Sequence, residues 1–229
     1  NKTLMNKFKL ITLAILCFGA TSILQAQTVD EILANYYENT GGLENWKNVK
    51  TLSFQGSVNF QGMELPIAMI QMENGKSLMK ADFQGQTFYQ NVFDGEATKN
   101  YQNDINDFPD PFIDYASKGH SVELVGTETI EGTETYKIKL TKEPIMVDGK
   151  EEQDITFYYF DTENFVPIVV EKEIKSGPAA GIIGQTKFSD YQEVEGLYFP
   201  FSITEGAKGQ PGGQQITITN IVINGEVDE

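Results

Sequence analysis

The feature that most constrains the fold is an alternation of apolar and polar side chains with a period of two, which recurs from residue 51 almost to the end of the sequence with a break at residues 103–120. In residues 51–60, for example, Leu52, Phe54 and Val58 are separated by polar residues. This period is typical of strands that bury one face. Turn-forming pairs such as Asn74-Gly75, Asp94-Gly95 and Asp148-Gly149 separate several of the runs, which indicates antiparallel hairpins.

The number of such runs predicts about ten or eleven strands. A single antiparallel sheet of that size has to curl. The sequence therefore predicts an α+β protein that is mainly β, with a curved sheet whose concave face is covered by two short helical pieces.

The first helical piece is predicted just before the strands. Thr28 and Glu31 have the spacing of a capping box, and Gly41-Gly42 supplies a stop. Between them, apolar residues recur at the helical spacing: Val29, Ile32, Leu33, Tyr36 and Tyr37. We expect an amphipathic helix that lies on an apolar surface.

The second helical piece is predicted where the strand pattern breaks, at residues 103–120. Its first half is rich in turn residues, and residues 112–116 are expected to form a short helix that begins near Pro111. An insertion of this kind between strands is a candidate lid over the sheet. His120, at its end, is expected to be an exposed or satisfied loop histidine.

The N-terminus has the order of a secretory signal peptide. Residues 5–9 are basic, residues 10–20 are mostly apolar, and small residues precede Gln27. We expect cleavage after Ala26, so that residues 1–26 are a signal peptide and 27–229 are one domain in the periplasm. The apolar run is short for a membrane anchor. The alternative of a lipidated Cys17 is less favoured, because Leu16 stands where a small residue is expected.

The charge of the chain excludes several classes of protein. All 17 basic residues are lysines, 33 residues are acidic and the net charge is −16. No basic face for nucleic acid is expected. One histidine and one cysteine argue against a zinc site, a disulfide framework or a Ser-His-Asp site. We expect no cofactor and no enzyme activity.

An apolar cavity on the concave face is the candidate site. Residues 64–72 are apolar on nearly both faces, and methionine suits adaptable apolar sites. The predicted lining is Tyr36, Met63, Leu65, Ile67, Met69, Met79, Phe83, Phe88, Phe93 and Phe112. The alternative is that the same side chains form an ordinary packed core.

Carboxylates offer two further interpretations. Asp104, Asp107, Asp110 and Asp114 carry oxygen ligands of the kind that Ca²⁺ takes, but their spacing matches no calcium loop. The acidic residues at positions 190, 193 and 195 are imaginable as a pair for glycoside hydrolysis, although strand alternation accounts for them equally well.

Four stretches of the sequence resemble the LolA-like superfamily, the periplasmic outer-membrane lipoprotein-sorting proteins and their relatives. They are a Thr-Gly-Gly-Leu-Glu-Asn-Trp run at residues 40–46, a Tyr-Phe-Asp-Thr-Glu-Asn-Phe-Val-Pro run at 159–167, and residues 125–138 and 188–201. The order and spacing of these stretches carry the resemblance, which spans nearly the whole of residues 27–229.

The resemblance implies a half-barrel closed by helices, with an apolar interior that holds acyl chains. It implies a carrier for a lipid or an acylated lipoprotein, in outer-membrane lipoprotein sorting, with a membrane-associated protein as a further partner and no span through the membrane. Carriers of this kind are expected to use an arginine near the cavity, and this sequence has none. A protein-interaction or sensor module of the same fold with a filled core is the alternative.

Overall fold

The structure is a computed structural model that describes residues 27–60, 62–94 and 107–226. For a few strand residues between positions 60 and 94, it describes the backbone and not the side chain. The elements of the described residues are α2 (Val29–Asn39), α3 (Leu43–Lys47), β1 (Thr51–Phe60), β2 (Met63–Met72), β3 (Lys76–Phe83), β4 (Gln86–Asp94), β5 (Ser121–Ile130), β6 (Thr133–Val147), β7 (Lys150–Asp161), β8 (Pro167–Glu173), β9 (Ile183–Val194), β10 (Leu197–Ala207) and β11 (Gln214–Ile223). The predicted signal peptide lies outside the described residues.

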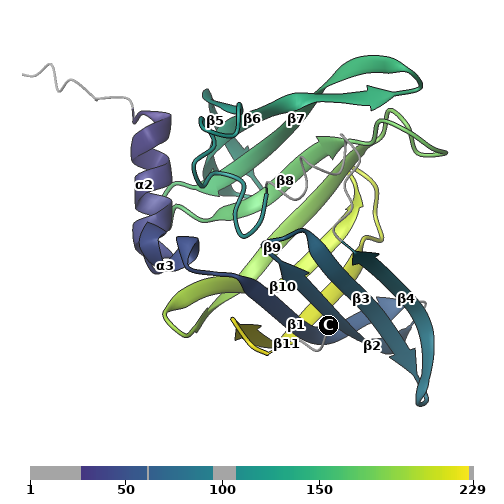
Figure 1. The fold of residues 1–229 in the computed structure, drawn as a ribbon. Coiled ribbons are helices and arrows are strands. Elements are labelled where there is room, and N and C mark those ends of the chain that lie inside the picture. Colours follow the sequence, from purple (N-terminus) through teal and green to yellow (C-terminus); the bar gives the residue numbers. More distant parts are fainter. Residues whose placement is uncertain (1–26, 61, 95–106, 227–229) are drawn as a thin grey trace, which may run out of the picture.

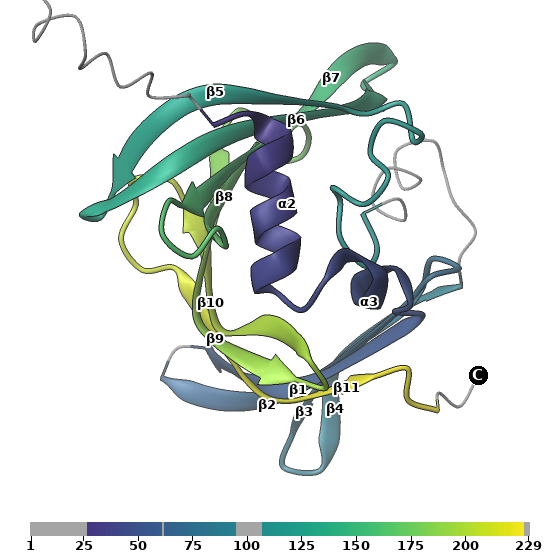
Figure 2. The same cartoon turned by 90° about the vertical axis from the view of Figure 1, so that its left-hand side faces the viewer.

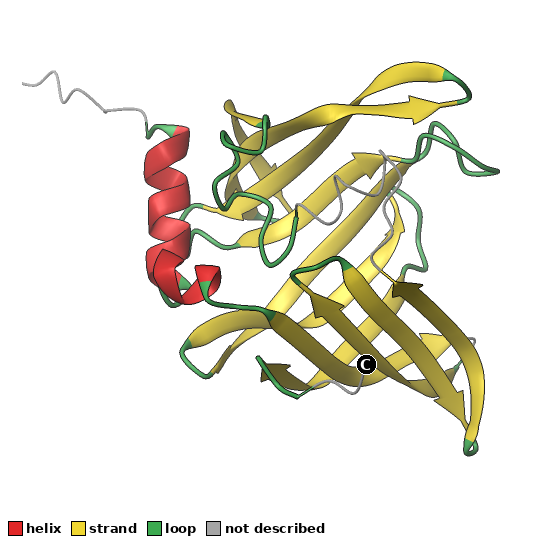
Figure 3. Ribbon diagram, in the orientation of Figure 1, coloured by secondary structure: helices red, strands yellow, loops and turns green. Residues whose placement is uncertain are grey.

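The eleven described strands form one antiparallel sheet in the order β4-β3-β2-β1-β11-β10-β9-β8-β7-β6-β5. The first strand, β1, therefore pairs with the last, β11. This pair joins the run of consecutive hairpins β1–β4 to the run β5–β11. The sheet curls around α2, which lies on its concave side with α3 (Figures 1 and 2). The predicted class, a mainly β protein with a curved half-barrel, is confirmed (Figure 3).

The predicted capping box starts α2. The backbone N–H of Glu31 donates to Thr28 Oγ1 at 3.2 Å, and the N–H of Thr28 donates to Glu31 Oε2 at 2.9 Å. The helix buries Ile32, Leu33 and the two tyrosines that follow at the same spacing. Local hydrogen bonds thus fix where the helix begins, and its apolar stripe fixes which side faces the sheet.

The helix-facing core joins both helices to the middle strands. Trp46 of α3 packs against Phe199 of β10, with ring centroids 5.1 Å apart. Ile138 and Leu140 of β6 are completely buried beneath α2. Because these contacts link distant parts of the chain, the core holds the curved sheet and its helices in one fixed arrangement.

The hairpin turns follow the turn chemistry of the sequence. Asp148 and Gly149, between β6 and β7, have φ values of 49° and 78°, and Gly75, between β2 and β3, has φ 81°. These positive values are what Asn-Gly and Asp-Gly turns provide. Both of these predicted turns are confirmed, whereas Gly95 of the Asp94-Gly95 pair lies outside the described residues.

The predicted short helix at residues 112–116 is wrong. The chain forms consecutive turns at residues 111–119, with hydrogen bonds such as Ser117 N to Asp114 O at 3.0 Å and Gly119 N to Ala116 O at 3.2 Å. Asp114 has φ 50°, and a residue in this left-handed region interrupts a right-handed helix. We call residues 107–120 the lid segment, since they lie against α2 on the concave side (Figure 2).

Candidate functional site

A buried carboxylate fastens the lid segment to α2. Asp110 accepts hydrogen bonds from Tyr36 Oη at 2.8 Å, from Tyr37 Oη at 2.6 Å and from the backbone N–H of Phe112 at 2.9 Å. Burial raises the pKa of Asp110, and the three donors oppose that rise. Burial, together with the nearby Asp110 charge, also raises the pKa of both tyrosines. We call these residues the Asp110 cluster.

The space directly under α2 is filled by the protein's own rings. The Phe160 ring of β7 lies 5.4 Å from that of Tyr36 and 5.7 Å from that of Phe112, in edge-on arrangements. Phe112 also meets Tyr158 at 4.8 Å. Edge-to-face rings at these distances are packed core contacts, so Tyr36 and Phe112 of the predicted cavity contribute to the core.

A second polar group lies beneath the other end of the lid segment. Lys142 of β6, almost fully buried, pairs with Asp107 at 2.5 Å. Lys172 of β8 pairs with Asp154 of β7 at 2.7 Å, and Asp154 is itself 2 % exposed. The first ion pair therefore ties the lid segment to β6, and the second ties β8 to β7. In each pair one of the two charged side chains is almost fully buried, so removing its partner would leave a buried charge uncompensated.

His120 departs from the expectation of an exposed or satisfied loop histidine. Its side chain is 5 % exposed, and among the described residues neither ring nitrogen has a hydrogen-bond partner. The backbone N–H of His120 donates to Tyr115 O at 3.0 Å, and this bond turns the end of the lid segment inward. Burial lowers the pKa of His120, and Lys142 and Lys118 lower it further, against smaller opposing effects of Glu143 and Asp154.

A pH-dependent stability follows from His120. The pKa of His120 in the folded chain is below the ordinary 6.5. Because the folded state then binds fewer protons than the unfolded state near this pH, the free energy of unfolding decreases as the pH falls below about 6.5. Asp110, with a raised pKa, acts in the opposite direction. Between about pH 7.5 and about pH 5, we expect chemical denaturation to show a larger loss of unfolding free energy in the wild type than in His120→Gln, where Asp110 is retained. Parallel curves for the two proteins would contradict this assignment.

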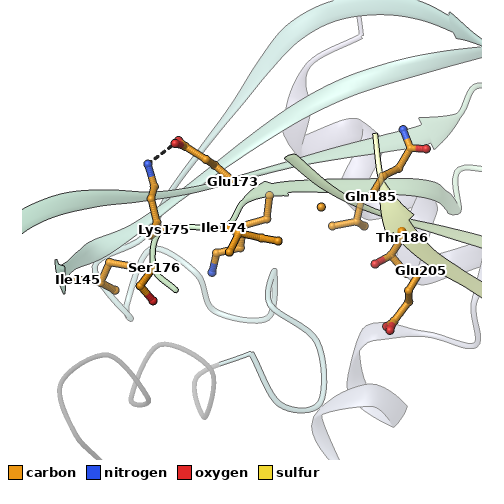
Figure 4. Close-up of a pocket in the computed structure, with 12 residues that line it drawn as sticks. Ile145, Glu173, Ile174, Lys175, Ser176, Gln185, Thr186 and Glu205 are labelled. Atoms are coloured by element: carbon orange, nitrogen blue, oxygen red, sulfur yellow. Dashed lines mark hydrogen bonds and ion pairs between the residues drawn. The ribbon is translucent and has the colours of Figure 1, made fainter. Parts of the chain in front are cut away.

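Open volume lies beside the core, over β8 and β9. One cavity of about 490 Å³ is lined by apolar residues Ile145, Val170 and Ile174, and by polar residues that include Thr186 and Glu205 (Figure 4). A second cavity of about 580 Å³, at the C-terminal end of α2, is lined by Ile168, Phe188, Tyr191 and polar residues that include Asn39 and Asn164. Both volumes are in the range of small-molecule sites.

The two cavities follow the same strand faces. Val170 of β8 is paired with Thr186 of β9, and Ile168 and Phe188 lie two residues further along these strands, on the same side. Ile174, at the other end, is six residues from Ile168, a distance of about 20 Å along an extended strand. We call this surface, from Ile168 and Phe188 to Ile174, the trough.

The predicted lining residues of β2 and β3 lie elsewhere. Met69 pairs across the strands with Met79, and Ile67 with Ala81, so these predicted residues share one sheet face. Leu65 is buried, Ile67 and Met69 are half-buried, and Met63 and Met79 are 45 % and 40 % exposed. The side chains of Phe83, Phe88 and Phe93 lie outside the described part. The predicted lining is therefore spread over the core and the β2–β3 surface. None of its members lines the two cavities of the trough, whereas Phe112 lines a further cavity of about 560 Å³ between α2 and the lid segment.

The carboxylates considered for hydrolysis do not converge in the structure. The side chains of Asp190, Glu193 and Glu195 are exposed in the β9–β10 hairpin. Asp190 accepts from Gln192 at 2.9 Å and Glu193 from Tyr198 at 3.3 Å. They bind neighbours in their own hairpin, as the strand-alternation interpretation predicts.

The calcium interpretation also lacks a site in the part that the structure describes, which holds no group of three or more potential metal ligands. Asp104 lies outside that part. Asp107 and Asp110 have the partners given above, and Asp114 pairs with Lys47 at 3.0 Å. Among residues 27–60, 62–94 and 107–226, no helix has the length and apolar character to cross a bilayer.

Comparison with known proteins finds similar solved structures at low sequence identity. No family model matches the sequence. No curated protein matches it either. Among solved structures, a DUF1329 family protein from Desulfovibrio piger is 12 % identical, with 86 % of this chain and 95 % of that chain covered and a TM-score of 0.45.

Two further structures are similar. A Vibrio parahaemolyticus domain described as that of an outer membrane lipoprotein-sorting protein is 8 % identical, covering 87 % of this chain and 93 % of that one, with a TM-score of 0.49. A LolA superfamily protein from Nitrosomonas europaea is 11 % identical, covering 88 % and 96 %, with a TM-score of 0.47. Two of these three structures bear names of the kind that the sequence motifs resemble, a lipoprotein-sorting protein domain and a LolA superfamily protein.

Proposed function

We propose that this chain is an exported, non-enzymatic carrier of the periplasm that binds the acyl chain of a lipid or of a lipid-modified protein in the trough. The trough supports this proposal because apolar strand residues there border open volume instead of packed side chains. Its length of about 20 Å suits an extended hydrocarbon tail. A role in outer-membrane lipoprotein sorting, with a membrane-associated partner, is the wider form of the proposal.

The expected energetics are favourable. Burial of a 16-carbon chain contributes about 12 kcal/mol gross, at about 0.8 kcal/mol for each CH₂. Ordering and association costs reduce this value substantially. The walls of the trough are already fixed by the Lys172–Asp154 ion pair and by strand pairing, so little of the remaining energy is needed to organise the protein.

Filling the trough tests the proposal. We expect Val170→Trp to occupy the place of about three methylenes and to weaken binding of an uncharged apolar probe, 1-N-phenylnaphthylamine, by roughly 50-fold, at about 0.8 kcal/mol per CH₂. Val222→Trp is the matched control, because Val222 is 38 % exposed on the opposite face of the sheet. Equal affinities of the wild type and Val170→Trp for this probe in a fluorescence titration would contradict the proposal.

A protein-interaction module is the second candidate, and one observation favours it. Ile182, in the β8–β9 loop, is 44 % exposed, and Ile183, at the start of β9, is 37 % exposed; Ile174, at the other end of the loop, is also exposed. Exposed apolar side chains gathered at one loop are typical of protein contacts. If Val170→Trp leaves probe binding unchanged while Ile182→Asp abolishes a partner interaction in a periplasmic pull-down, this second function is the better description.

A further inference from the structure

The charged residues around the trough determine which head groups a bound acyl chain can carry. This inference rests on the proposed carrier function. At the end near Ile174, two lysines line the cavity. Lys175 pairs with Glu173 at 2.6 Å (Figure 4) and with Glu152 at 3.5 Å. Lys172 pairs with Asp154 at 2.7 Å. Glu205 lines the same cavity. Lys175 and Glu173 project from the opposite side of the strand to Ile174 (Figure 4). On the side of the trough, two carboxylates, Asp154 and Glu205, therefore face one ammonium group, Lys172, and this end carries a net negative charge.

The end near α2 is also acidic. Among the described residues, its lining contains one ionisable acid, Asp161, and no lysine or histidine. Asp161 is held in place by hydrogen bonds from the N–H of Glu163 at 2.7 Å and from the side-chain amide of Asn164 at 2.9 Å. Asn39 donates to Asn164 O at 2.8 Å. The polar groups here are amides, hydroxyls and a carboxylate, which suit hydroxyl or amide donors on a ligand.

We infer that the trough selects acyl chains whose head group carries no negative charge, such as esters or amides of a fatty acid, over free fatty acids and acyl phosphates. A carboxylate or phosphate held at either end would meet an excess of like charge in a partly desolvated site. Lys172, the lysine on this face of the described lining, is already neutralised by Asp154. Selection of this kind comes from a repulsive element as much as from an attractive one.

Two ligands that share one tail test this inference. A pyrene-labelled monoacylglycerol is neutral, and the corresponding free pyrene-labelled fatty acid is an anion at neutral pH. We expect the wild type to bind the neutral ester about tenfold more tightly, as one or two partly screened like-charge contacts produce. The ratio should shrink as the ionic strength rises from about 0.01 M to about 1 M, where screening shortens from about 30 Å to about 3 Å.

Charge-changing variants locate the head group. Glu205→Lys at one end and Asn39→Lys at the other each add a cation, and we expect one of them to raise the affinity of the free acid to that of the ester. Glu64→Lys is the control for Glu205→Lys, because Glu64 is exposed on β2, away from the residues that line the trough. Asn39→Gln is the neutral control for Asn39→Lys.

The outcomes separate the inference from the carrier proposal. Equal affinity of the wild type for acid and ester overturns the head-group selection and leaves the carrier proposal standing. A preference for the ester that neither lysine variant changes overturns its electrostatic cause. If neither ligand binds at all, the carrier proposal itself fails.

Discussion

Replacing Asp110 by alanine is expected to lower the free energy of unfolding by about 3 kcal/mol or more. The substitution leaves three buried donors without their acceptor: the hydroxyls of Tyr36 and Tyr37 and the backbone N–H of Phe112. It also removes the contact that fastens the lid segment to α2. Urea unfolding followed by the fluorescence of Trp46, which is buried in the same core, measures the loss.

Two variants control for effects other than these hydrogen bonds. Asp110→Asn keeps an acceptor oxygen and the side-chain volume, and should cost about 1 kcal/mol. Glu38→Ala removes an exposed acid from the same helix, α2, and should stay within about 0.5 kcal/mol of the wild type. A stability of Asp110→Ala equal to that of Glu38→Ala would show that the Asp110 cluster does not hold the lid segment.

Gly41→Ala is expected to be the second severe substitution, with a loss of about 4 kcal/mol or an unfolded chain. Gly41 has φ 109°, and a Cβ at this position would lie 2.0 Å from the backbone oxygen of Gly196. The corner between α2 and α3 sits directly on the β9–β10 turn there, where Tyr198 N donates to Thr40 O at 3.1 Å. Neither backbone can move without lifting the helices from the sheet.

Gly132→Ala separates backbone strain from this collision. Gly132, between β5 and β6, has φ 91°, and no atom lies within 4 Å of a Cβ built there. It should therefore show the cost of the positive φ alone, about 1–2 kcal/mol. If thermal unfolding gives the same loss for Gly41→Ala and Gly132→Ala, the close approach of the two backbones is not what makes Gly41 necessary.

Local chemistry explains which parts of the fold were predictable. The capping box at Thr28, the glycine stop after Thr40 and the turn at Asp148-Gly149 are fixed by neighbouring residues, and all three are formed. The lid segment could not be predicted in the same way. The left-handed conformation of Asp114 there depends on how the chain packs between α2 and β6, beyond the reach of a local pattern.

The β5–β6 hairpin shows a second limit of pattern reading. The strand pattern is clear in the sequence at residues 121–126 and 136–141, whereas the ladder continues to Ile130 and begins again at Thr133. The intervening residues are mostly polar because β5 is an edge strand with much of its surface in water. Alternation marks a strand only where one face is buried, so the outer part of this hairpin carries no such mark.

The trough is hidden from the sequence for a related reason. Residues 165–174 are rich in apolar β-branched residues, and Ile168 and Val170, two residues apart in β8, share one face of the strand. Alternation cannot distinguish a face that is covered from one that borders open volume. That difference depends on where α2 ends and how far the lid segment reaches, which are properties of the assembled chain. The sequence instead points to the methionines of β2, because residue type is the one signal for an adaptable apolar site that a sequence provides.

Native mass spectrometry of the protein isolated from its own host, without detergent, tests the central claim most directly. We predict that the wild type and Val222→Trp each retain one acyl lipid, released and identified on collisional activation, and that Val170→Trp retains none. A wild-type protein that carries no lipid, or a Val170→Trp variant that carries as much as the wild type, would contradict the assignment of the trough as an acyl-chain site.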